Sequence, residues 1–146
     1  MQAQLIGGDE KTYALIFQSG DEVASGLLSF ARENHLAASH FTAIGAFSDA
    51  MLAYFDWQKK EYQKIPVNEQ VEVLTLAGDI ALKDDGEPQV HAHCILGRRD
   101  GSTIGGHLQS AHVRPTLEVI LTESPRHLRR KHDPQSGLAL IDPKSD

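Results

Sequence analysis

The stretch QVEVLTLAGDIALKDDGEPQVHAHCILGR, residues 70–98, holds two apolar runs separated by a tight-turn signal. The first run, residues 70–83, is rich in β-branched and aliphatic residues and predicts a long strand. Asp85-Gly86 favours a tight turn, because glycine accepts the positive φ that hairpin turns need. Residues 90–98 then predict the returning strand. Strands joined by so short a turn are antiparallel neighbours, and this hairpin therefore decides the fold class.

Further strands are predicted on both sides of the hairpin. A second Asp-Gly turn signal stands at Asp100-Gly101. The predicted strands cover residues 12–20, 39–58 (two strands, broken near 45–49), 70–83, 90–98 and 115–123. Residues 59–69, KKEYQKIPVNE, are predicted to be a polar connection.

One helix is predicted early in the chain, over residues 21–35. Its apolar residues recur at helical spacing, and two acids stand where the helix dipole favours them. We expect this helix to cover one face of the sheet. The sequence therefore predicts a single α+β domain over residues 1–124, with a mostly antiparallel central sheet covered by one or two helices. Residues 125–146 are expected to be a C-terminal tail that is partly docked, through Leu138, Leu140 and Ile141, or partly disordered.

Composition excludes several classes of protein. The 146 residues carry a formal net charge of −6, which opposes a broad electrostatic surface for nucleic acid and makes DNA a doubtful partner. The single cysteine, Cys94, cannot form an intrachain disulfide. No secretory signal pattern opens the chain, and no apolar run approaches the roughly 20 residues that span a bilayer. The expectation is a cytoplasmic protein without a membrane partner.

Histidines concentrate in and after the returning strand. Alternation along that strand places His91 and His93 on the face opposite Cys94, with Cα atoms roughly 6–7 Å apart. His107 follows Gly105-Gly106, where the backbone can bend and bring a third imidazole to the first two. Three neutral imidazoles would leave one position open on zinc, although copper, nickel and iron also accept imidazole. The alternative is three polar surface or interface histidines.

Two carboxylates are candidates for an acid/base or metal-supporting role. Glu118 and Glu72 each alternate with apolar residues on a predicted strand, so either side chain can leave the core face. The simpler interpretation of each is a solvated or salt-bridged carboxylate. The only basic run, RHLRRKH at residues 126–132, could contact nucleic acid or an acidic partner, but a solvated segment is the favoured interpretation.

Several of these segments, taken in order, resemble a known family. They are FARENHLAASHFTAIGAFSDAMLAYFD (30–56), VEVLTLAGDIAL (71–82), VHAHCILGRRDG (90–101), IGGHLQSAHV (104–113) and TLEVILTE (116–123). Together they resemble the PPC (plants and prokaryotes conserved) domain, which also stands behind AT-hooks in plant nuclear proteins. The resemblance covers roughly residues 12–123. The Arg-Gly-Arg-Pro core of an AT-hook is absent, because GRRDG has neither the glycine between arginines nor the proline.

The resemblance implies a homotrimer with a metal site carried by His91, His93 and His107. The hypothesis that follows is a trimeric protein that binds a transition metal, most simply zinc, and takes a small molecule at that metal. The alternative is a DNA-associated or protein-interaction module without catalysis, so whether the protein is an enzyme stays open. A cupin also uses H-x-H on a strand, but its later acid and Gly-Asp-Pro-type turns do not follow His93.

Overall fold

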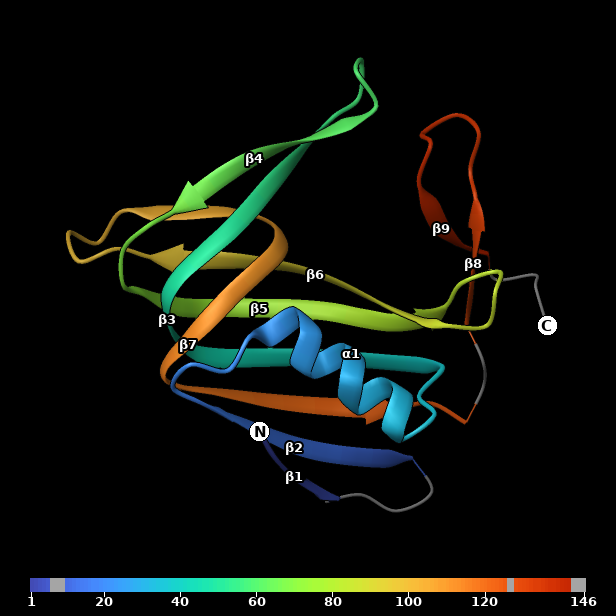
Figure 1. The fold of residues 1–146 in the computed structure, drawn as a ribbon, viewed down its shortest axis with the longest axis horizontal. Helices are drawn as coiled ribbons and strands as arrows, with labels where there is room; N and C mark the ends of the chain where they lie inside the picture. The colour runs from blue at the N-terminus through green and yellow to red at the C-terminus, as the bar shows by residue number, and fades with distance from the viewer. Residues whose placement is uncertain (6–9, 126–127, 143–146) are drawn as a thin grey trace.

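The computed structural model describes residues 1–5, 10–125 and 128–142. Arg126 and His127, the first two residues of the basic run, therefore lie outside the described residues, as do residues 143–146 at the end of the predicted C-terminal tail. Within the described part the elements are β1 (Gln2–Leu5), β2 (Lys11–Gln18), α1 (Val23–Glu33), β3 (Ala38–Asp56), β4 (Glu61–Val67), β5 (Val71–Leu82), β6 (Pro88–Gly97), β7 (Thr103–Glu123), β8 (Arg129–His132) and β9 (Ala139–Asp142) (Figure 1).

The nine strands form one sheet that closes on itself through its four longest strands. Along its main path the order is β1-β2-β7-β3-β5-β8-β9, while β4 pairs with β3, and β6 pairs with both β5 and β7. The pairings β3–β5, β5–β6, β6–β7 and β7–β3 thus form a ring, and all four are antiparallel. The expected mostly antiparallel sheet is confirmed.

The helix content is lower than predicted. Within the described residues there is one helix, the 11-residue α1, so a cover of one or two helices was an overstatement. One short helix is enough because the sheet closes on itself. Many of its buried side chains pack against one another, and α1 covers the rest of the apolar face. The buried face of α1 consists of Val23, Leu27, Phe30 and Ala31, the positions whose spacing predicted it.

The main departure from the predicted elements is the length of the strands. Residues 39–58 were expected to form two strands, but β3 is continuous from Ala38 to Asp56. It shifts register against its neighbours between Ala43 and Asp49, and again at Met51/Leu52, instead of ending. β7 likewise starts at Thr103 and not at residue 115. Gly45 lies in this irregular part, where a Cβ would stand 2.3 Å from the carbonyl oxygen of Thr116. Glycine lets β3 bend there against β7 without ending.

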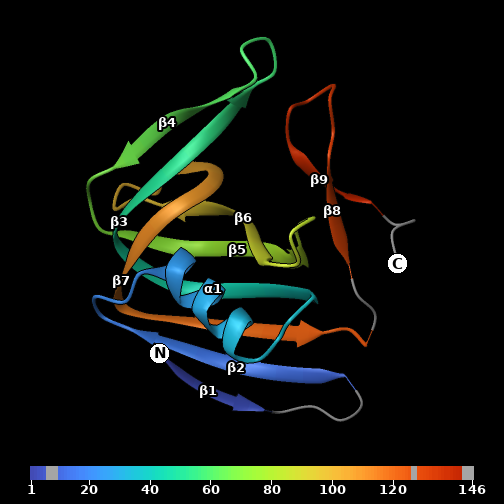
Figure 2. The same ribbon diagram turned by 45° about the vertical axis from the view of Figure 1, so that its right-hand side comes forward.

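The predicted polar connection at residues 59–69 was also wrong, because residues 61–67 form β4. This strand pairs with the second half of β3, from Ala50↔Val67 to Asp56↔Glu61. The β3–β4 hairpin projects from the sheet, and the β8–β9 hairpin stands beside it across β6 (Figure 2). Proline and charged residues hid the strand signal here, because β4 lies at an edge where such residues are tolerated.

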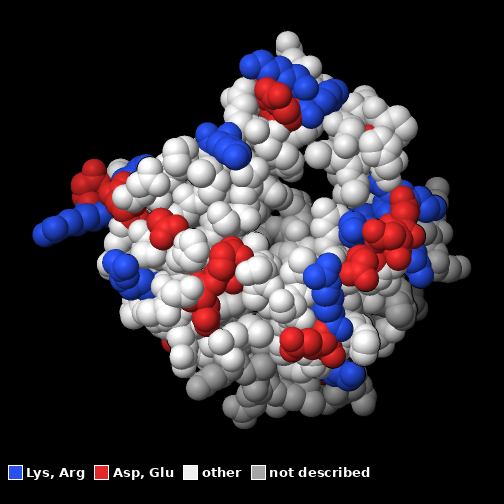
Figure 3. All heavy atoms as spheres, viewed as in Figure 1, with Lys and Arg blue, Asp and Glu red and all other residues white. Residues whose placement is uncertain are grey.

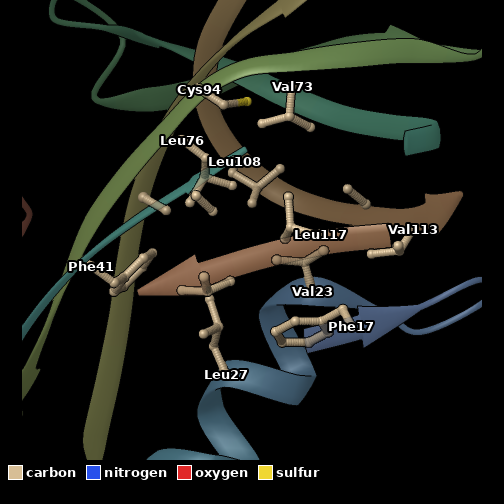
Figure 4. Close-up of a cluster of buried hydrophobic side chains, with 14 of the residues drawn as sticks. Phe17, Val23, Leu27, Phe41, Val73, Leu76, Cys94, Leu108, Val113 and Leu117 are labelled. Atoms are coloured by element: carbon tan, nitrogen blue, oxygen red, sulfur yellow. The ribbon is translucent and has the colours of Figure 1, made fainter. Parts of the chain in front are cut away.

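The core lies between the sheet strands and α1. Figure 4 shows Leu27 and Val23 of α1 close to Phe17, and Leu76, Cys94, Leu108 and Leu117 further along the same apolar layer. Strand alternation predicts that Val90, Ala92, Cys94 and Leu96 of β6 face the core; the last three are buried, and Val90 is partly buried against the core. Burial raises the pKa of the Cys94 thiol to about 11, so it behaves as a small apolar side chain. No helix in the described residues is long and apolar enough to cross a membrane.

Candidate metal centre

Three histidine side chains converge on one point at the side of the sheet. His91 and His93 come from β6, and His107 from β7, where it is the cross-strand partner of His93. One ring nitrogen from each lies within 4.8 Å of the others. Nε2 of His91 and Nε2 of His93 are 3.2 Å apart. Two imidazoles on a tetrahedral zinc have their nitrogens roughly 3.3 Å apart, given zinc–nitrogen distances of about 2.0–2.1 Å, so this pair already has the spacing of zinc ligands.

Local sequence explains how the third histidine reaches the first two. A Cβ on Gly105 would lie 3.0 Å from the carbonyl oxygen of Cys94, and one on Gly106 would lie 2.9 Å from that of Ala53. β7 therefore runs close to β6 on one side and to β3 on the other only because both positions are glycine. The close approach puts His107 in register with His93, in agreement with the role predicted for the two glycines.

The electrostatic setting keeps two of these imidazoles neutral. Burial, together with the nearby His91 and His93, lowers the pKa of His107 to about 4. Burial and His91 also lower the pKa of His93. A neutral imidazole is the form that ligates a metal, since the ligating nitrogen must carry a lone pair and no proton. The cluster is thus chemically suited to a cation and poorly suited to holding protons.

A carboxylate supports the cluster from the neighbouring strand. Asp79 of β5 is the cross-strand partner of His91, and its Oδ2 is 3.6 Å from His91 Nδ1. Its Oδ1 accepts a hydrogen bond from Arg130 of β8, whose side chain is only 5% exposed. Burial alone would raise the pKa of Asp79, but the contact with His91 and the charge of Arg130 bring it below its ordinary value. An ionised carboxylate at Nδ1 leaves Nε2 of His91 as the ligating atom.

An aromatic wall closes one side of the cluster. The ring of Tyr62 in β4 lies over His107, with ring centroids 4.6 Å apart and planes tilted by 31°. Phe55 in β3 packs against Tyr62 in an edge-to-face arrangement, with ring centroids 5.2 Å apart. The β3–β4 hairpin therefore restricts the orientation of one candidate ligand.

The structure brings together some of the sequence-predicted site residues and not others. His91, His93 and His107 form one group, as the sequence predicted. Glu72 lies opposite Gly97, and Glu118 lies opposite Ile44; neither belongs to the three-histidine group among the described residues.

The carboxylate beside the cluster is Asp79, which the sequence analysis missed. A signal for it existed, because a hairpin centred on the Asp85-Gly86 turn places residue 79 opposite residue 91. Arg130 and Tyr62 carried no such signal, since β8 and β4 reach the cluster only through the tertiary fold.

Comparison with known proteins gives the family. The Plants and Prokaryotes Conserved (PCC) domain matches residues 4–125, most of the chain. The chain belongs to this family. The resemblance seen in the sequence, where the domain was abbreviated PPC, is thereby confirmed. A search of curated proteins found no match.

Solved structures of related proteins agree with this assignment. A PPC protein from Pyrococcus horikoshii is 32% identical, with a TM-score of 0.85 and coverage of 99% of this chain and 96% of that one. A metal-containing protein from Archaeoglobus fulgidus is 35% identical, with a TM-score of 0.82 and coverage of 97% and 98%. A candidate DNA-binding protein from Ralstonia eutropha JMP134 is 29% identical, with a TM-score of 0.83 and coverage of 89% and 90%.

Proposed function

We propose that this PCC-domain protein is a homotrimer that binds one zinc ion per chain through His91, His93 and His107. The observation that carries the proposal is the convergence of three imidazole nitrogens within 4.8 Å. A similar protein from Archaeoglobus fulgidus is described as metal-containing, which supports it. The biochemical activity that the metal would serve is a further question.

Zinc is the cation that fits this donor set best. Magnesium and calcium prefer oxygen ligands, and this cluster offers nitrogen. Three neutral histidines would supply three of the four ligands that zinc usually takes, and would leave one position for water or another small molecule. When bound, such an ion supplies a Lewis acid that lowers the pKa of a bound water or polarises a carbonyl group. The chain's own residues hold and orient it: Asp79 fixes the ring of His91, and Tyr62 that of His107.

Self-association of the chain is supported by an exposed apolar stripe, made of Ile44, Leu74, Ile95 and Ile120. These side chains are 47–62% exposed and lie on the four consecutive strands β3, β5, β6 and β7. Each points away from the buried layer under α1, as Ile120 does between the buried Val119 and Leu121. A second copy of the chain is the partner that would cover it, since closed rings of identical subunits are the common way to bury such a surface.

The metal site and the apolar stripe are continuous. His93 and Ile95 are two residues apart on β6, so their side chains leave the same face of the sheet. Association through the stripe would place the histidine cluster at or beside the contact between subunits and shield it further from water.

The test is a zinc titration against a competing chromogenic chelator, with the His91→Ala/His93→Ala variant beside the unmodified chain. We expect one equivalent of zinc per chain and its loss in the double variant, because one imidazole cannot hold the ion alone. His112→Ala is the matched control: His112 is exposed, contacts Asp49 at 2.8 Å and lies outside the cluster. Full metal content in the double variant would refute the ligand assignment.

The alternative function is a DNA-associated or protein-interaction module without catalysis. The name of the Ralstonia eutropha neighbour favours it. The net charge of −6 opposes it, as do the interspersed acidic and basic side chains on the face in Figure 3. An anisotropy titration with duplex DNA at roughly 0.15 M salt decides this branch. No binding at tens of micromolar would discard it, given nonspecific dissociation constants of about 10⁻⁴–10⁻⁶ M.

A further inference from the structure

A small pocket adjoins the histidine cluster on the side of the C-terminal hairpin. Its volume is about 150 Å³, and its polar lining comes from Tyr62, Gln89, His91, His107 and Arg130. Leu138, Ala139 and Leu140 close the remaining side. In the space-filling view the molecule is hollowed between the β3–β4 and β8–β9 hairpins (Figure 3). The pocket joins two candidate metal ligands to a buried arginine.

We propose that this pocket binds a small carboxylate, with one oxygen at the open position of the metal and the other accepting a hydrogen bond from Arg130. The proposal rests on the proposed metal site and names the class of molecule that the site would take. Neither β8 nor β9 was connected to the metal in the sequence analysis, so the pocket gives the C-terminal hairpin a function.

The first argument is that residues with unpaired buried polar atoms gather around the pocket. Among the described residues, four buried side-chain nitrogen or oxygen atoms have no hydrogen-bond partner, and three of them belong to lining residues: Gln89 Oε1, His107 Nδ1 and Arg130 Nε. A buried polar atom without a partner costs free energy, and such atoms collect where a bound molecule supplies the missing bond. The polar lining as a whole indicates a polar ligand and not an apolar one, although Gln89 Oε1 is itself an acceptor and does not pair with a carboxylate.

The second argument is that Arg130 still has N–H groups that can donate hydrogen bonds. Its Nη1 donates to the carbonyl oxygen of Ala139, and its Nη2 donates to Asp79. A guanidinium has five N–H donors, so these two bonds leave three for an acceptor, Nε–H among them. An anionic oxygen forms the strongest such bond with a guanidinium, because both partners are charged.

The third argument is the charge around the pocket. The lining residues include no carboxylate, and the nearby Asp79 is balanced by Arg130. A divalent cation held by neutral histidines would therefore leave two uncompensated positive charges. An anion that reaches both the metal and the guanidinium balances part of this charge, whereas a neutral molecule does not.

The fourth argument is size. A cavity of about 150 Å³ accepts a molecule as large as benzene. A carboxylate with a short aliphatic or single-ring body therefore fits, while a nucleotide or a peptide does not. Leu138, Ala139 and Leu140 would contact the apolar body, and the metal and Arg130 would bind the carboxylate at the other end.

The experiment is calorimetric titration of sodium benzoate into the zinc-loaded full-length protein, after its metal content has been measured. Benzamide, which has nearly the same shape and no charge, is the control ligand. We expect one benzoate per chain and at least about tenfold weaker binding of benzamide. Arg130→Gln should weaken benzoate about tenfold or more, whereas Lys131→Gln should not, because Lys131 lies on the same strand outside the pocket.

A second variant keeps the test decisive if Arg130→Gln disturbs the hairpin. Ala139→Leu narrows the pocket without touching a charge, so it should weaken benzoate far more than acetate. Equal benzoate affinity in the unmodified protein, Arg130→Gln and Ala139→Leu would overturn the proposal, as would equal affinity for benzamide. Metal uptake without benzoate binding would overturn this proposal alone, whereas absence of metal uptake would refute the proposed function as well.

Discussion

At the scale of single residues, the histidine cluster depends on a carboxylate that is not itself a ligand. Oδ2 of Asp79 lies 3.6 Å from Nδ1 of His91, and Oδ1 forms an ion pair with the buried Arg130. We expect Asp79→Asn to weaken zinc binding by about 10–100-fold, because loss of such a supporting partner loosens the tautomer and orientation of the ligand. The measurement is the same chelator competition.

Glu72→Gln is the control for Asp79→Asn. Glu72 lies on the same strand, is exposed and stands outside the cluster. If both variants bound zinc as tightly as the unmodified chain, Asp79 would be an ordinary salt-bridge partner of Arg130 and nothing more.

The three histidines were predictable, and their surroundings only in part. Strand alternation and a glycine pair are local features, so His91, His93 and His107 could be found from the sequence. Asp79 needed the hairpin register as well. Arg130 and Tyr62 reach the site from strands that pair across the molecule, and no local pattern carries that information. Glu72 and Glu118 were candidates because strand alternation predicts which face of a strand a side chain leaves. Alternation does not predict which other residues that face lies near.

At the scale of elements, α1 is anchored at its start by Glu22. The Glu22 carboxylate accepts hydrogen bonds from the backbone of Ser25 (2.7 Å), Ala24 (3.1 Å) and Ala111 in β7 (3.2 Å). It thus caps the helix and ties it to the sheet. We expect Glu22→Ala to lower the free energy of unfolding by roughly 2 kcal/mol, one part from the cap and one from the bond to β7. Urea unfolding measures it, with Glu33→Ala at the exposed end of α1 as the control.

The contribution of Glu22 also has a pH dependence of known sign. Burial alone would raise its pKa, but the hydrogen bonds to its carboxylate lower the pKa below the ordinary value of 4.5. The stabilisation is therefore present above pH 4.5 and is lost as the pH falls through the folded-state pKa. The difference in stability between the unmodified chain and Glu22→Ala should shrink below pH 4.5; a difference that stayed constant into acid would contradict this origin.

The order of most elements followed from the sequence, whereas the lengths of β3 and β7 did not. Turn signals marked the hairpins correctly, because Gly86 and Gly101 lie in positive-φ turns. Gly45 and Gly105-Gly106 look similar in sequence, but they allow long strands to bend and pack closely without ending. Only the tertiary contact tells a glycine that ends a strand from one that bends it.

At the scale of the whole molecule, the apolar stripe predicts association. Ile44→Lys/Ile120→Lys places two charges in it, and we expect the mass in solution to fall from about three chains of 16.0 kDa to one. Ser29→Lys adds a charge on the exposed side of α1, on the other face of the sheet, and should leave the mass unchanged. Light scattering coupled to size-exclusion chromatography measures both. A double variant that kept the trimer mass would place the interface elsewhere.

The most direct test of the metal-binding trimer is elemental analysis of the untagged protein as purified, with the molecular mass recorded on the same sample. We predict close to one transition-metal ion per chain, zinc above all, in a particle of three chains. A protein that carries no metal, and takes up none when zinc is added, would contradict the central claim and make the three histidines a structural cluster.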